Sequence, residues 1–302
     1  MALHRYAFRA MAADNEVQIH AEDARVARNA AQRAIDEVRR VEAKYSRYRE
    51  GSLLSRINAA AGGDPVEVDD ETRALLDYAD ACWRQSGGRF DVTSGVLRRA
   101  WNFDVARVPA DAELAPLLAL VGWPRVERDG AQVRLPIPGM ELDFGGLGKE
   151  YAVDRAIAEV AALGIDSALV NLAGDLAILG PQPCGVPWRV GIRHPREPHA
   201  LAASFDLSSG AVATSGDYER YVEVDGIRHC HLLDPRTGYA THGLRSVTVH
   251  GPSCLVAGSA ATIAMLLGEE EGLRWLSTLG LPSYVIRADG SVVDTFATRA
   301  AL

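Results

Sequence analysis

The sequence predicts an α+β fold, in which antiparallel or mixed sheets pack against several helices. Three Asp-Gly pairs, at 129–130, 225–226 and 289–290, lie between β-prone runs, which is the strongest local signal of a β-hairpin. Amphipathic helical stretches are interspersed with these hairpins, without the regular strand–helix alternation of a parallel sheet. Because no internal repeat or linker interrupts the chain, we expect residues 1–302 to form a single domain.

The N-terminal part of the chain predicts one strand followed by two helices. Residues 5–20 are expected to form the strand, which acidic residues follow. Residues 24–47 are expected to form a helix, because apolar side chains recur on one face. That face holds Val26, Ala30, Ile35, Val38, Val41 and Tyr45. After a loop over 50–69 that contains Gly and Pro, a second helix is expected over 71–86, capped by Asp70 and ended by a Gly-Gly pair.

Three more helices and two more strands are expected beyond the first hairpin. The helices cover 149–163, 254–267 and 269–279, and the strands cover 168–179 and 187–193. The first two of these helices show apolar side chains at helical spacing. These side chains are Val153, Ile157 and Val160 in one helix, and Val256, Ala260, Ile263 and Leu267 in the other.

The composition excludes several classes of protein. The 302 residues are 48% hydrophobic and 24% charged, which excludes a disordered chain, and the net charge of −8 gives no reason to expect binding to nucleic acid. No run of 18 apolar residues is present, so we expect no membrane span. The first ten residues contain charges and lack an apolar segment, so we expect no secretory signal. The four cysteines form no CxxC, and the expected compartment is the cytoplasm.

The Gly-rich segment over 143–155 is the most unusual one for chemistry. Three glycines and Lys149 precede a predicted helix, and backbone N–H groups at a helix start favour phosphate. The segment is not a Walker A loop, because Asp143 stands where the first Gly would be and Glu150 follows the lysine. It is not a dinucleotide fingerprint either, because GxGxxG is absent. A purely structural strand-to-helix turn is the alternative.

Other polar segments are weaker when each is taken alone. The NLAGD sequence at 171–175 is typical of an Asx turn, and the DPRTG sequence at 234–238 has the composition of a turn. His229 and His231 share one face of a predicted strand, but two histidines are too few for a zinc site. The SGGRFDVTSG sequence at 86–95 either contacts a ligand or packs a corner.

Taken together, the segments resemble the ApbE family, the FAD:protein FMN transferases, in order along nearly the whole chain. The matching segments are FRAM at 8–11, YSRYREGSLLSRIN at 45–58, SGGRFDVTSGVLRRAW at 86–101, LDFGGLGKEYAVDRA at 142–156, NLAGD at 171–175, TSGDYERY at 214–221, HLLDPRTGY at 231–239 and SVTV at 246–249. The resemblance implies T-fold-like antiparallel sheets with packed helices. It also implies that the protein binds FAD and Mg2+, splits the FAD pyrophosphate, transfers FMN to a Thr or Ser hydroxyl of a target flavoprotein and releases AMP.

The resemblance also implies site residues at matching positions of this chain. Residues that contact FAD would be Met11, Tyr48, Arg89, Phe90, Asp91, Asp143, Lys149 and His231. Metal ligands would be the backbone carbonyl of Gly146 and the side chain of Thr262. Aromatic and Met side chains suit a ring system, and a lysine suits a pyrophosphate.

Two departures from the family pattern stand out. Met11-Ala12-Ala13 replaces the usual Met-Gly-Thr, and Gly258 replaces a usual Asp that binds Mg2+ together with the Thr one turn later. Ser259 or a carboxylate from elsewhere could take over, because Mg2+ prefers hard oxygen ligands. On the sequence alone we expect Gly258→Asp to raise Mg2+ affinity.

The alternatives to a full transferase follow from these observations. A flavin-binding protein with weak or no transfer is the alternative function, because of Gly258. A Ser–His–Asp hydrolase is a third class, since Ser94 and Ser215 lie beside glycines, but no GxSxG is present.

Overall fold

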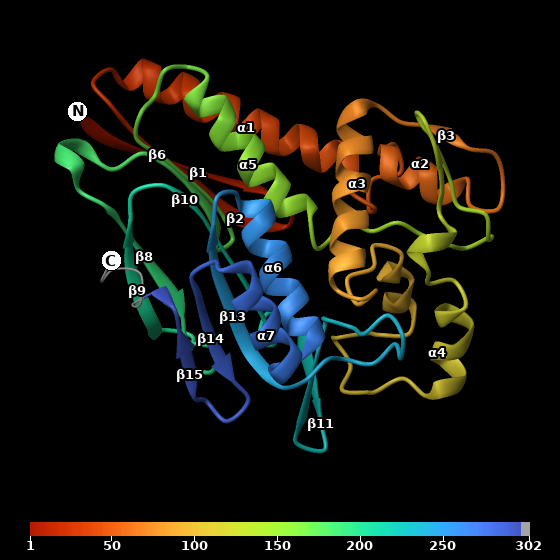
Figure 1. The fold of residues 1–302 in the computed structure, drawn as a ribbon. Coiled ribbons are helices and arrows are strands. Elements are labelled where there is room, and N and C mark those ends of the chain that lie inside the picture. Colours follow the sequence, from red (N-terminus) through yellow and green to blue (C-terminus); the bar gives the residue numbers. More distant parts are fainter. Residues whose placement is uncertain (297–302) are drawn as a thin grey trace.

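The computed structural model describes residues 1–296, and an eight-stranded antiparallel sheet runs through it (Figure 1). The strand order is β1-β2-β6-β7-β10-β13-β14-β15, and every neighbouring pair is antiparallel. These strands are β1 (Ala2–Ala10), β2 (Ala13–Ala21), β6 (Ala168–Leu172), β7 (Asp175–Leu179), β10 (Gly210–Gly216), β13 (Leu244–Gly251), β14 (Ser283–Arg287) and β15 (Val292–Asp294). The predicted α+β class with antiparallel sheets is therefore confirmed.

Three helices form a layer against this sheet. Helix α1 (Ala24–Tyr45) packs on β1 and β2, α5 (Gly148–Ala161) on β6 and β7, and α6 (Cys254–Leu267) on β10 and β13. Helix α5 touches both of the others, so it lies between them (Figure 1). The buried face of α1 is rich in alanine, which lets backbones approach closely. Helix α7 (Glu269–Leu279) packs on α6.

The remaining elements stand at one end of the helix layer or beyond the sheet (Figure 1). The helices are α2 (Leu53–Ala59), α3 (Asp70–Gln85) and α4 (Asp111–Leu118). A small sheet has the order β3 (Val66–Glu67), β5 (Gln132–Arg134), β4 (Glu127–Asp129). Two hairpins are β8 (Trp188–Arg193) with β9 (Leu201–Leu207), and β11 (Tyr221–Val224) with β12 (Ile227–Cys230). Short 3-10 turns cover Ser94–Arg99, Trp123–Arg125 and Pro183–Gly185. No helix within residues 1–296 combines the length and the apolar character that a membrane crossing requires.

The elements predicted from periodicity and Asp-Gly turns are confirmed. All three predicted hairpins form, as β4–β5, β11–β12 and β14–β15. Helices α6 and α7 have the predicted bounds, and α1, α3 and α5 begin or end within two residues of theirs. The cap of α3 is Asp69 rather than Asp70, because the Asp69 carboxylate accepts the N–H of Thr72 at 3.0 Å.

Two segments that were predicted as single strands are hairpins in the structure, so these predictions are wrong. The prediction of a loop over 50–69 is also wrong. Residues 5–20 form the hairpin β1–β2, whose turn residues Met11 and Ala12 have φ of 52° and 60°. The turn escapes a sequence reading because neither residue is Gly or Asn. Residues 168–179 form the hairpin β6–β7 in the same way. The loop contains α2, which Ser52 caps by accepting the N–H of Ser55.

Candidate active site at the start of helix α5

The Gly-rich turn before α5 is held by Asp143. The Asp143 N–H donates to the carbonyl of Val92 at 2.8 Å, and its Oδ1 accepts the N–H of Gly145 at 2.9 Å. Its other carboxylate oxygen pairs with Arg47. A Cβ at Gly95 would lie 2.5 Å from Asp143 Cβ, so the neighbouring 3-10 turn must have a glycine there. Asp143 thus shapes the turn, and its carboxylate is already engaged with Arg47 and Gly145.

Lys149, in the first turn of α5, forms an ion pair with Asp175. The distance from Lys149 Nζ to Asp175 Oδ2 is 2.7 Å. Burial acts to lower the pKa of Lys149, but the carboxylates of Asp175 and Glu150 raise it above its usual range. The lysine is therefore fully charged at neutral pH, at a helix start where N–H groups also favour anions.

Asp175 is a site residue that the sequence reading missed. It is 3% exposed, and its Oδ1 accepts the N–H of Thr214 at 3.1 Å. The NLAGD turn brings it there: Asn171 Oδ1 accepts the N–H of Gly174 at 2.8 Å, so the side chain of the asparagine stabilises the turn, three residues on rather than the two of the predicted Asx turn. The available signal was an aspartate directly after a tight turn, at the start of a strand whose other residues are apolar.

The two predicted metal positions, Thr262 and Gly146, lie in the middle of α6 and in the turn before α5. Thr262 is 9% exposed, and its Oγ1 lies 2.7 Å from Ser215 Oγ of β10. A Cβ at Gly146 would lie 3.2 Å from the ring of Phe90, so this glycine lets the aromatic ring pack on the turn. A Cβ at Gly258 would lie 2.5 Å from Glu150 Cγ and 3.1 Å from Glu150 Oε1.

The contact with Glu150 bears on the expectation for Gly258→Asp, which stays a prediction. A new side chain would displace a buried glutamate and place a second carboxylate beside it, and like charges at close range repel. No group of three His, Cys, Asp or Glu that could hold a metal occurs within residues 1–296.

The stretch over 89–91 has three different environments. Phe90 is buried against the Gly-rich turn. Arg89 donates to the carbonyl of Leu266 at 3.1 Å and to Glu271 at 3.2 Å. Asp91 already accepts three hydrogen bonds, two from the N–H and the hydroxyl of Thr93 and one from a backbone N–H at 3.0 Å. The geometry around Asp91 is that of a structural anchor.

The other predicted flavin contacts come from separate loops. Met11 lies in the β1–β2 turn, where its N–H donates to Glu42 at 2.9 Å. Tyr48 is 75% exposed after α1, and the guanidinium of Arg47 stacks 4.8 Å from its ring centroid. His231 follows β12, and its N–H donates to the carbonyl of Arg220 at 2.9 Å.

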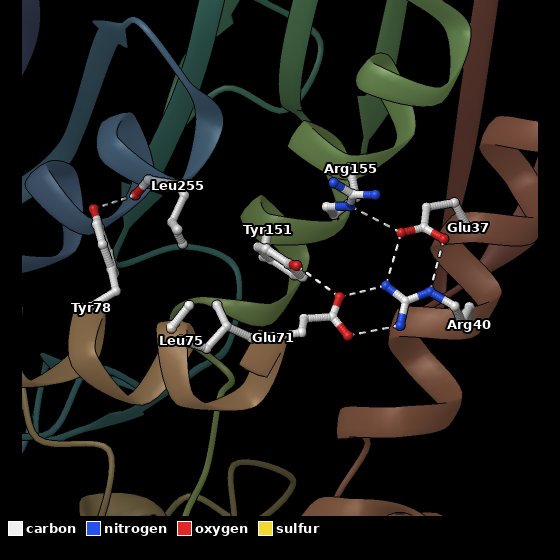
Figure 2. A pocket seen from close by; sticks show the side chains of 9 residues that line it. Glu37, Arg40, Glu71, Leu75, Tyr78, Tyr151, Arg155 and Leu255 are labelled. Carbon is white, nitrogen blue, oxygen red and sulfur yellow. Dashed lines mark hydrogen bonds and ion pairs between the residues drawn. The ribbon is translucent and has the colours of Figure 1, made fainter. Parts of the chain in front are cut away.

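A pocket of about 480 Å3 lies between α1, α3, α5 and the start of α6, and an ion-pair network lines it (Figure 2). Figure 2 shows Glu37 and Arg40 of α1, Glu71 of α3, and Tyr151 and Arg155 of α5. Arg40 pairs with Glu37 and Glu71, Arg155 Nε donates to Glu37 at 3.1 Å, and the Tyr151 hydroxyl donates to Glu71 at 2.7 Å. None of the predicted site residues lines this pocket. The network holds α5, and hence Lys149, in place.

Comparison with known proteins gives one family. The ApbE family model matches residues 11–285. A Vibrio cholerae protein named FAD:protein FMN transferase is 32% identical over 251 residues, which are 80% of this chain and 75% of that protein. The crystal structure of an ApbE protein from Thermotoga maritima superposes with a TM-score of 0.90 at 30% identity over 99% of both chains. An apo flavinyl transferase ApbE from Pseudomonas stutzeri gives 0.88 at 30% identity over 99% of this chain and 96% of that one. The chain belongs to the ApbE family.

Proposed function

We propose that this chain is an FAD:protein FMN transferase, which moves FMN from FAD to a Thr or Ser hydroxyl of a target flavoprotein. The observation that carries the proposal is the similarity over most of the chain to relatives that bear this name. Those names favour transfer over flavin binding alone. Residues 1–302 would act as one unit.

The reaction exchanges one phosphorus–oxygen bond for another. The acceptor hydroxyl attacks the phosphorus on the FMN side of the pyrophosphate, the bridging P–O bond breaks, and AMP leaves with that electron pair. The hydroxyl proton passes to a base or to solvent. Negative charge builds on the leaving phosphate, so catalysis depends on positioning and on positive charge around the pyrophosphate.

In this proposal, different residues of the chain bind the pyrophosphate, the ring systems of FAD and the metal. Lys149 and the backbone N–H groups of the Gly-rich turn bind the pyrophosphate. Met11, Tyr48, Phe90 and His231 contact the flavin or the adenine. Arg89, Asp91 and Asp143 also contact FAD, and Asp91 and Asp143 in addition hold the turns that shape the site. The carbonyl of Gly146 and the hydroxyl of Thr262 would hold Mg2+, which when bound neutralises charge on the pyrophosphate.

Covalent labelling of an acceptor tests the proposal. The purified chain is incubated with FAD, MgCl2 and a flavoprotein from the same organism that has lost its covalent flavin. A denaturing gel viewed under ultraviolet light reports the covalent flavin. We expect a fluorescent acceptor band that depends on FAD and is not formed from free FMN, since FMN has no AMP to lose. A band that forms equally well from FMN would contradict the proposal.

A further inference from the structure

Glycine at position 258 needs an explanation, because it lies in the middle of a helix. A helical Gly is less favourable than Ala by about 1 kcal/mol. Gly258 is buried in α6, and a Cβ there would meet Glu150 Cγ at 2.5 Å and Cδ at 3.1 Å. The space that a side chain at 258 would fill is taken by the carboxyl group of Glu150, which enters from α5.

Glu150 is itself poorly satisfied by its surroundings. The residue is 7% exposed, and its Oε2 has no hydrogen-bond partner among the described residues. Burial raises the pKa of Glu150 above its usual range, and the nearby Asp175 raises it further, whereas Lys149 lowers it. The nearest cation, Lys149, is already paired with Asp175 at 2.7 Å. A buried carboxylate with a free oxygen is unfavourable unless a cation or a proton reaches it.

The two elements that meet at Glu150 and Gly258 also carry oxygen donors that suit a hard cation. Thr262 lies one helical turn beyond Gly258, so the two positions share a face of α6. The turn that contains Gly146 leads directly into the helix that carries Glu150. A carboxylate, a hydroxyl and a backbone carbonyl are oxygen donors of the kind that Mg2+ selects.

We propose that Glu150 is the carboxylate ligand of the divalent cation in this chain, acting with Thr262 and Gly146, and that Gly258 is present to make room for it. The family pattern that the sequence resembles has this carboxylate on α6, at position 258, and in this chain Glu150 of α5 would supply it from the adjoining helix. This inference rests on the proposed function, since it concerns the cation that the transfer reaction would use.

Binding of Mn2+ tests the assignment without any measurement of activity. Electron paramagnetic resonance of free Mn2+ is recorded during a titration of the full chain, once with Mn2+ alone and once with saturating FAD. We expect Glu150→Gln, which keeps the shape of the side chain, to weaken Mn2+ binding by roughly tenfold or more. The control Glu159→Gln removes a charge from the same helix, where the side chain is 26% exposed, and should leave Mn2+ affinity unchanged.

A relocation variant gives a second and sharper readout. Glu150→Gly alone should lose Mn2+ binding, and adding Gly258→Asp to it should recover most of the lost affinity, because the carboxylate returns to the same space from α6. Mn2+ should also raise the thermal unfolding midpoint of the wild-type chain and not that of Glu150→Gln. Circular dichroism confirms that each variant is folded.

The possible outcomes separate this inference from the proposed function. Wild-type affinity in Glu150→Gln, or no Mn2+ binding by the wild-type chain with or without FAD, overturns the assignment of Glu150. Mn2+ binding that depends on Glu150 in a chain that does not cleave FAD supports the assignment and contradicts the proposed function.

Discussion

The turn between β1 and β2 places two residues in a backbone conformation that L-amino acids rarely adopt. Met11 and Ala12 have φ of 52° and 60°, although neither is Gly or Asn. The left-handed conformation is unfavourable by about 1–2 kcal/mol for a residue with a Cβ. A turn with this strain holds Met11 at the position where the resemblance places a flavin contact.

Ala12→Gly is therefore expected to stabilise the protein. Relief of the left-handed strain exceeds the extra entropy that Gly brings to the unfolded chain, so the free energy of unfolding should rise by about 0.5–1 kcal/mol. Urea unfolding measures this free energy. The control Ala13→Gly changes the first residue of β2, which is not left-handed, and should lower stability instead. A loss of stability in both variants would show that the turn is not strained.

Lys149 is the residue whose charge the proposed function needs most. A charge-assisted hydrogen bond contributes about 1.5–3 kcal/mol, so Lys149→Ala should weaken FAD binding by roughly tenfold or more. Isothermal titration calorimetry measures the affinity. Lys44→Ala is the matched control, because Lys44 also pairs with carboxylates, but these are Asp69 and Glu71 at the start of α3. Equal FAD affinities for the two variants would contradict this role of Lys149.

At the scale of elements, the ion-pair network in Figure 2 joins α1, α3 and α5 through Glu71. Burial raises the pKa of Glu71, but Arg40, Lys44 and Tyr151 together lower it to about 2, from an ordinary value of 4.5. A lowered folded-state pKa means that the stabilisation is complete above pH 4.5 and is lost as the pH falls toward 2.

Glu71→Gln should therefore flatten the acid side of the stability profile. A shift of this size corresponds to about 3 kcal/mol, which solvent screening of the partly exposed network reduces to about 1–2 kcal/mol. The loss of unfolding free energy between pH 7 and pH 3, measured with urea, should be smaller in the variant by that amount. Asp129→Asn, in an exposed hairpin turn, serves as the control. If the unfolding free energy falls by the same amount in Glu71→Gln and in the wild-type chain, the ion pairs of Glu71 do not account for the acid sensitivity of the fold.

Elements with local signals were predictable, and elements that depend on distant contacts were not. Helix α6 was predicted to the residue from its apolar spacing, and the structure shows that Ser253 caps it and Gly268 follows its last residue. The Asp-Gly hairpins were predicted for the same kind of reason, whereas the Met11-Ala12 turn carries no such signal. Helix α2 is only 7 residues long, which is too short for periodicity to reveal it inside a loop.

The candidate site shows the same division. The Gly-rich turn and Lys149 stand out in the sequence because their composition is unusual. The pairing of Lys149 with Asp175 depends on a helix start meeting the start of β7, and the packing of Glu150 on Gly258 depends on α5 touching α6. Such contacts between separate elements follow from the order of the strands in the sheet. No local sequence pattern predicts that order.

At the scale of the whole molecule, the sheet and its helix layer bring together segments that are far apart in the chain. Strands β6 and β7 lie between the N-terminal hairpin and β10, so the α5 helix start, the Asp175 turn and the middle of α6 meet at one place. The proposed function places the cleavage of FAD at this point of the fold, with the help of a divalent cation.

Release of AMP from FAD tests that claim most directly. The purified chain is incubated with FAD and MgCl2, and the nucleotides are separated by liquid chromatography. We expect AMP to appear with time, and chelation of the metal by EDTA to abolish it, while calorimetry shows that the protein binds FAD. A chain that binds FAD but releases no AMP above the protein-free control, with Mg2+ present and an acceptor flavoprotein added, would contradict the account.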